Sequence, residues 1–310
     1  MISSFFNRAK PINFLLISLY LGFFYWITQI YLYDTGWTVP VFFSYAGVFL
    51  AIVFSVFLAN FIIRKNALCT GNSYAVLLFV MFLTLFPQIF RSSEIIMANL
   101  FVLLALRRVI SIRSLLQIKQ KIFDASLWVC VAALFYEWAL LFLLVVFAAI
   151  LIYRFGDYRN WLVPLVAIFT VGVLLSTYVI WFTGIDWFVD VFSFSVDFYS
   201  IKTRTIGFIL PVALIAFFTL LSLAAFIANY KAKSTGVQSS LLLVIIALLV
   251  GTGIAAVSNN RESDEVVFTF FPAAVLMANY LQLITRKWWK ESILWLFIIL
   301  PVALLFIGQT

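Results

Sequence analysis

Residues 73–106 read SYAVLLFVMFLTLFPQIFRSSEIIMANLFVLLAL, in which two apolar runs of 73–87 and 93–106 flank a polar stretch with Arg91 and Glu94. A helix that crosses a bilayer needs about 20 apolar residues, with a range of about 17–25, so each run is short for a crossing. Charged side chains at membrane depth are costly and usually mark a cavity, a pathway or a binding site. This stretch therefore predicts two short membrane helices that are hinged at a candidate site.

A second stretch has the same organisation. Two apolar runs, 123–136 and 138–153, meet at Glu137, which lies between Tyr136 and Trp138. An acidic residue in a loop is usually just solvated, but Glu137 has apolar sequence on both sides. We therefore expect a second hinge and a second candidate site residue here.

The composition sets the fold class. Hydrophobic residues make up 65% of the 310 residues and charged residues 10%, against about 45–50% and about 25% in soluble domains. The 36 phenylalanines, 13 tyrosines and 10 tryptophans suit lipid-facing helices with aromatic belts. The sequence predicts an all-α polytopic transmembrane bundle, with residues 1–310 forming a single integral membrane domain. The first apolar run is long enough to span, and no small-residue cleavage site follows it, so we expect it to remain as the first helix.

Reading each apolar run as its own crossing gives eleven crossings. They are 13–33, 39–63, 73–87, 93–106, 123–136, 138–153, 161–183, 207–229, 238–257, 266–284 and 293–308. With the N-terminus in the cytoplasm, 16 of the 20 Lys and Arg residues fall in cytoplasmic connections, as the positive-inside rule requires. If 123–153 is fused into one helix, 12 basic residues lie inside and 8 outside. If 73–106 is fused as well, 11 lie inside and 8 outside. Both hinges are therefore expected to turn back at the outer side.

The net charge of +8 is thus an orientation signal, and we expect no nucleic-acid partner. Nine of the 12 acidic residues fall outside in this topology. They are Asp34, Glu94, Glu137, Asp186, Asp190, Asp197, Glu262, Asp264 and Glu265. These acids have two interpretations, as solvated loop residues or as parts of a functional site on the outer face.

Three connecting segments have recognisable patterns. Residues 107–122 predict a basic amphipathic helix on the cytoplasmic membrane surface. Residues 184–206 combine aromatic and acidic side chains, which fits either an outer interfacial helix or an aromatic-belt loop. Residues 258–265, SNNRESDE, read as a polar outer loop without an assigned role.

Missing residue types exclude several functions. The chain has no histidine, which removes histidine-ligated haem and iron centres and histidine acid–base catalysis. Its two cysteines, Cys69 and Cys130, are too few for a metal site. No phosphate-binding Walker loop and no Gly-x-Ser-x-Gly motif is present. We therefore expect no metal and no cofactor.

The charged residues at the hinges suit an outward-facing cavity above the short helices. Irregular backbone is tolerated at membrane depth where it lines such a cavity. Arg91 is a candidate phosphate ligand, because guanidinium groups hold phosphates through paired hydrogen bonds. A partly desolvated carboxylate can act as a general base, which makes Glu137 a candidate catalytic residue with Glu94 in support.

The succession of a first helix, an outer-loop acid in YLYDTGW, short paired helices and the stretch IFDASLWVCVAALFYEWALLFLL resembles the membrane scaffold of GT-C glycosyltransferases. This resemblance implies the use of a polyprenyl-phosphate sugar, and it implies a catalytic acid in the first outer loop, at Asp34. The opening MISSFFNRAKPINFLL resembles an uncharacterised inner-membrane family of Bacteroidota.

Two functions from different classes fit these observations. One is an inner-membrane glycosyltransferase that takes a sugar from a polyprenyl-phosphate donor at the periplasmic face, with Asp34 and Glu137 as catalytic residues and Arg91 and Glu94 at the substrate. The other is a non-catalytic subunit or assembly factor of an envelope-biogenesis or secretion complex, with a membrane protein as partner. A lipid transporter is a weaker third interpretation, since no coupling-ion site is visible.

Overall fold

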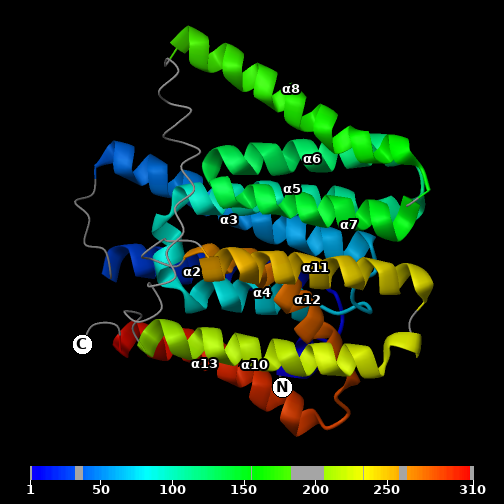
Figure 1. Ribbon diagram of the computed structural model, residues 1–310. Helices are drawn as coiled ribbons and strands as arrows, with labels where there is room; N and C mark the ends of the chain where they lie inside the picture. Colours follow the sequence, from blue (N-terminus) through cyan, green and yellow to red (C-terminus); the bar gives the residue numbers. More distant parts are fainter. Residues whose placement is uncertain are drawn as a thin grey trace. The chain divides into compact units, whose positions relative to one another are not determined.

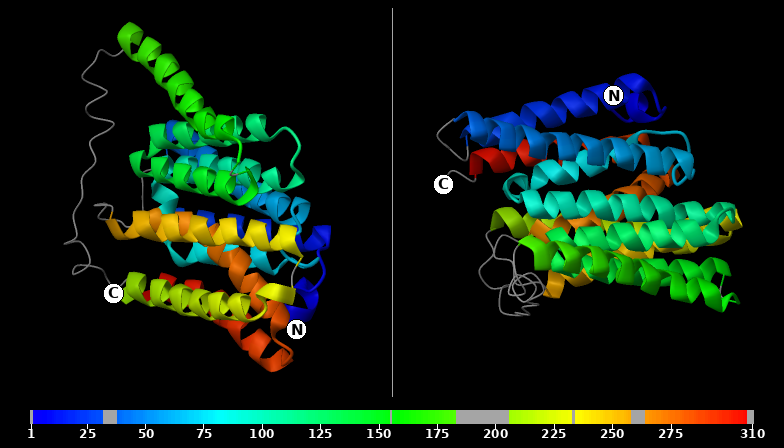
Figure 2. Two further views of the ribbon diagram at one scale, coloured as in Figure 1. Left: turned by 45° about the vertical axis from the view of Figure 1, so that its right-hand side comes forward. Right: turned by 90° about the horizontal axis from the view of Figure 1, so that it is seen from above.

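The computed structural model describes residues 2–31, 38–154, 156–182, 206–232, 234–257 and 264–307 (Figures 1 and 2). Within these ranges every regular element is helical, which confirms the predicted all-α class. Among the described residues, eight helices are long and apolar enough to cross a membrane. Each of the eleven predicted apolar segments coincides with a helix. Among the described residues the chain thus has the character of a multi-pass membrane protein.

The chain divides into two compact units. The first unit comprises Met1–Ser93, Ile201–Gln238 and Thr269–Thr310. It contains α1 (Ile2–Phe6), α2 (Pro11–Tyr31), α3 (Val39–Lys65), α4 (Tyr74–Leu85), η1 (Pro87–Arg91), α10 (Ile206–Ala228), η5 (Tyr230–Ala232), most of α12 (Val267–Leu283) and α13 (Lys287–Ile307).

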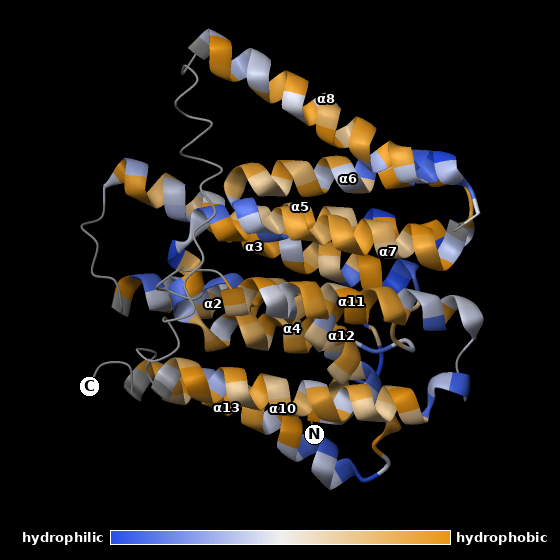
Figure 3. Ribbon diagram, in the orientation of Figure 1, coloured by the Kyte–Doolittle hydropathy of each residue, from blue (hydrophilic) through white to orange (hydrophobic). Residues whose placement is uncertain are grey.

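The second unit comprises Glu94–Ser200 and Ser239–Phe268. It contains α5 (Ser93–Ser111), η2 (Ile112–Ser114), α6 (Ile118–Phe135), η3 (Glu137–Phe142), α7 (Leu143–Arg154), α8 (Tyr158–Phe182), most of α11 (Thr235–Val257) and η6 (Asp264–Val266). Hydrophobic residues predominate along α8, and hydrophilic residues gather at the end where it begins (Figure 3). This pattern fits a helix that crosses the apolar layer from one polar boundary.

The core of the first unit is α4. All 12 of its residues are buried, and it packs against α2, α3 and α13. A helix that is apolar on every side is normally enclosed by protein. Because neighbouring helices surround α4, its short length need not match the thickness of a bilayer.

The end of α4 has a local cause. Pro87 starts η1, and the preceding residue Phe86 leaves the helical region with φ −125° and ψ 76°. A proline disfavours helical backbone in the residue before it. The first predicted hinge is therefore a 3₁₀ turn imposed by Pro87, and in the chain it ends shortly before Ser93, the last residue of this segment of the first unit.

Polar contacts join three segments at one end of the first unit. The backbone N–H and the hydroxyl of Ser3 donate to Glu291 Oε1 at 3.1 and 2.7 Å. Tyr74 donates its hydroxyl proton to the Ser3 carbonyl at 2.6 Å, and Ser73 N–H donates to the Phe6 carbonyl at 3.0 Å. These bonds connect α1 with the beginnings of α4 and α13.

The second predicted hinge is confirmed as a turn. The chain leaves α6 at Tyr136, which has extended backbone with φ −152° and ψ 111°, and passes through η3 into α7. Helix α7 contacts both α6 and η2, the element that precedes α6, and the two helices lie side by side in the views (Figures 1 and 2). The chain therefore doubles back at η3 and forms a helical hairpin.

The structure differs from the sequence-based prediction at residues 107–122. The segment is not one amphipathic helix: α5 continues to Ser111, and α6 begins at Ile118. Lys121 is buried, and its ammonium donates to the Ser111 carbonyl at 2.7 Å and the Ser114 hydroxyl at 2.6 Å. This cation closes the turn by satisfying acceptors that a helix end leaves unpaired.

The same difference changes the lengths of the helices on both sides. Helix α5 has 19 residues and α6 has 18, so the expectation of short helices at 93–106 and 123–136 was wrong. Arg108 and Asp124, one from each helix, form an ion pair at 3.0 Å. Because these two charges pair within the protein, both helices extend into residues 107–122, a segment whose sequence predicts a surface helix.

Candidate functional site

The four predicted site residues fall into different parts of the chain. Asp34 lies outside the described residues, as does almost all of the aromatic and acidic segment 184–206. Arg91 ends η1 in the first unit and has an exposed side chain. Glu94, in the first turn of α5, is exposed, whereas Glu137 begins η3 and is half-buried. Of the described predictions, only Glu137 is thus substantially shielded by the protein.

At the first hinge, η1 directs its apolar side chains inward. Phe90 is fully buried, and its ring lies 5.2 Å from that of Tyr25 and 6.5 Å from that of Phe24. The Gln29 amide donates to the Phe90 carbonyl at 3.5 Å, at the long limit of a hydrogen bond. Packing against α2 therefore holds this hinge, while Arg91 points to the surface.

At the second hinge, a hydrogen bond connects η3 with η6. Tyr136 donates its hydroxyl proton to Glu265 Oε1 at 3.0 Å. The Tyr136 ring also stacks on Phe268, with centroids 5.8 Å apart and planes at 23°. Phe142 lies 5.8 Å from the same Phe268 ring. The hinge that precedes Glu137 is thus packed against the beginning of α12.

Two consecutive carboxylates are buried at this junction. Asp264 is 0% exposed and Glu265 is 1% exposed. They form the first two residues of η6, directly before α12, where the positive end of a helix favours negative charge. Removing carboxylates from water is expensive, and such groups are retained most often for a specific role. The pair is the strongest candidate site in the described part of the chain.

This pair was not predicted from the sequence, because residues 258–265 have the composition of a polar outer loop. Asp264 and Glu265 end that polar stretch, but the apolar run VVFTFF follows them without an intervening glycine or proline. This direct transition from two acids to a buried helix is the only signal that could have distinguished them from solvated loop acids.

The chemistry of the site is that of a carboxylate cluster. Tyr136, Asp264 and Glu265 can exchange protons with a hydroxyl group or hold a cation, and Glu137 follows Tyr136 in the chain. No group of three His, Cys, Asp or Glu residues within the described ranges could hold a metal ion. Carboxylates beside a tyrosine hydroxyl suit proton transfer or hydrogen bonding of a polar substrate.

Comparison with known protein families identifies the family of the chain. Residues 8–309 match the model of a family of unknown function, DUF6427, and the chain therefore belongs to that family. No curated protein and no solved structure matches the chain.

Proposed function

We propose that this member of the DUF6427 family is a membrane-embedded transferase that takes a sugar from a polyprenyl-phosphate donor. The buried pair of Asp264 and Glu265, held at the second hinge by Tyr136, is the observation that supports this proposal most directly. General bases in enzymes are commonly carboxylates shielded from bulk water. Keeping two carboxylates away from bulk water is costly, and packing alone does not explain it.

The proposed topology has eleven crossings in a bacterial inner membrane, with the N-terminus in the cytoplasm. Contacts within each unit agree with it. Tyr136 and Glu265 come from two connections that the distribution of basic residues assigns to the outer side, and they are hydrogen-bonded. Ser3 and Glu291 come from two segments assigned to the cytoplasm, and they are hydrogen-bonded as well.

In the proposed reaction, a hydroxyl oxygen of the acceptor forms a bond to the anomeric carbon of the sugar. The bond from that carbon to the phosphate oxygen breaks, and polyprenyl phosphate leaves with the electron pair. The hydroxyl proton passes to a carboxylate of the outer side, for which Glu265, Glu137 and Asp34 are the candidates. Arg91 and Glu94 are the residues that the sequence alone predicts for binding of the donor phosphate.

The test is a transfer assay with the full chain in proteoliposomes. Polyprenyl-phosphate hexoses and pentoses are supplied, and release of polyprenyl phosphate is measured. We expect Glu265→Gln to lower the rate about 100-fold or more, because it keeps the acceptor for Tyr136 and removes the base. Glu137→Gln, Asp34→Asn and Arg91→Ala identify which of the other residues take part.

Asp124→Asn is the matched control, since Asp124 is a carboxylate of the same unit that pairs with Arg108 away from the candidate site. It should leave the rate within about twofold of the parent, as expected for a partly exposed ion pair. The proposal fails if no polyprenyl-phosphate sugar is bound or consumed by the folded protein.

A second candidate function is a non-catalytic subunit of a membrane complex, and α8 favours it. Its side chains Phe169, Leu174, Ile180 and Trp181 are 72%, 66%, 73% and 81% exposed. Such a surface fits a partner helix as well as lipid. A stable stoichiometric partner that co-purifies in mild detergent, together with full cellular function of Glu265→Gln, would favour the subunit.

A further inference from the structure

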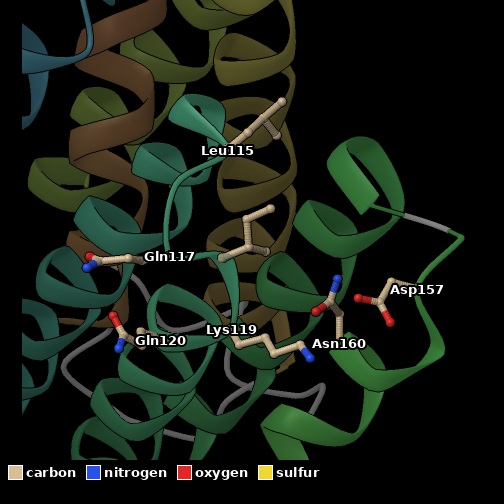
Figure 4. Close-up of a pocket in the computed structure, with 7 residues that line it drawn as sticks. Leu115, Gln117, Lys119, Gln120, Asp157 and Asn160 are labelled. Atoms are coloured by element: carbon tan, nitrogen blue, oxygen red, sulfur yellow. The ribbon is translucent and has the colours of Figure 1, made fainter.

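The beginnings of α6 and α8 line two adjoining open pockets in the second unit. The first has a volume of about 460 Å³ and is lined by Leu115, Gln117, Ile118, Lys119, Gln120, Asp157 and Asn160 (Figure 4). The second, of about 440 Å³, shares Lys119 and Gln120 with it. The shared residues join a polar compartment to an apolar one.

The polar compartment has side chains of both signs. Lys119, Asn160 and Asp157 gather on one side of it (Figure 4). Asn160 is 2% exposed, and its Oδ1 accepts no hydrogen bond from the described residues. Asp157 Oδ1 accepts the Arg159 backbone N–H at 3.2 Å, which leaves its second oxygen for a ligand. This compartment can therefore hold a group that donates hydrogen bonds and is positively charged.

The second compartment contributes cations and an apolar wall. Among the residues that the structure describes, Lys119 and Arg159 are in no ion pair, while Asp124 is neutralised by Arg108. Beyond the two cations, the wall continues along the helices through Phe123, Leu162, Val163 and Val166. Leu162 and Val166 are each 54% exposed, so this wall is open to the surroundings of the helices.

This order of groups matches one class of ligand. In a zwitterionic phospholipid, an ammonium group is followed by a phosphate and then by two acyl chains. In this site, an acceptor-rich compartment is followed by two cations and then by an apolar wall, so the order is the same. The site also lies at the end of α8 where hydrophilic residues gather, the level at which lipid headgroups are expected.

We propose that this site binds phosphatidylethanolamine. The ammonium faces Asp157 and Asn160, the phosphate faces Lys119 and Arg159, and one acyl chain follows Phe123 and Val166. An anionic lipid such as phosphatidylglycerol would leave Asp157 without a cationic partner. Phosphatidylcholine has no N–H with which to satisfy Asn160. The site is independent of the transferase proposed above.

The experiment uses the full chain, delipidated in detergent and titrated with lipids that have identical acyl chains. Bound lipid is counted by native mass spectrometry. We expect the first molecule of phosphatidylethanolamine to bind about tenfold more tightly than phosphatidylcholine or phosphatidylglycerol, as the loss of one charge-assisted contact predicts. Equal binding of the three lipids overturns the proposal without requiring any variant.

Variants then locate the site. The double variant Lys119→Ala and Arg159→Ala should weaken phosphatidylethanolamine about tenfold. Asp157→Asn keeps an oxygen for the Arg159 backbone N–H and should abolish the preference over phosphatidylglycerol. Lys287→Ala, which removes an exposed cation at the start of α13, is the control and should change nothing. Unaltered selectivity in the first two variants contradicts the assignment.

Discussion

The two hinges, η1 and η3, look alike in the sequence but differ in what breaks the helix. Pro87 ends α4 locally, whereas neither glycine nor proline occurs near Tyr136. At η1 the charged side chains are exposed and apolar packing holds the turn. At η3 a hydrogen bond to Glu265, 129 residues further along the chain, accompanies the break. A charge within an apolar run thus marks a turn at both hinges. It accompanies a buried polar contact only at η3.

The largest expected effect on this comparison comes from Glu265→Ala. It leaves the Tyr136 hydroxyl without its acceptor and creates a cavity, so we expect a loss of about 3 kcal/mol of stability. Thermal unfolding in detergent, followed by circular dichroism, measures this loss. Glu265→Gln keeps an oxygen for Tyr136 and should lose much less. An equal loss in both variants would mean that the charge of Glu265, rather than the hydrogen bond, stabilises η3.

Tyr136→Phe has the next largest effect. It keeps the stacking on Phe268 but removes one donor from a buried carboxylate, with an expected cost of about 1–2 kcal/mol. Tyr158→Phe, at a residue that is 70% exposed, provides the control and should leave the melting temperature unchanged. If both variants melt like the parent, the hydrogen bond contributes nothing, and the difference between the hinges disappears.

Gln29→Met should have the smallest effect, because it tests the hinge that we attribute to packing. The substitution nearly conserves volume and removes the long 3.5 Å contact with the Phe90 carbonyl, so the change should stay below about 1 kcal/mol. The same melting experiment measures it. A loss as large as that of Tyr136→Phe would show that η1 also depends on a buried polar contact.

Several elements could be predicted because their causes are local. Long apolar runs identified the positions of eleven of the helices in the described ranges, and the end of α4 before Pro87 also has a local cause. The region 107–122 could not be predicted in this way. Its cations read as a surface helix, and only folding brings Lys121 to the carbonyl end of α5 and Arg108 to Asp124.

The candidate site was predicted only in part. Glu137 was recognised because apolar residues flank it, but the buried pair at 264–265 was assigned to a polar loop. The burial of Asp264 and Glu265 depends on their position between η3 and α12, which no spacing along the chain specifies. Arg91 and Glu94 stood out equally in the sequence, yet their side chains are exposed.

The sequence by itself determined the class, the helices and the first hinge. Hydrophobicity over a window of about 20 residues and the fixed φ of proline are properties of a few neighbouring residues. Tertiary structure alone decided that Glu265 is buried and meets Tyr136, and which cations close a turn rather than line a cavity. These outcomes depend on whether water or another side chain faces the charge, and residues far apart in the chain decide that.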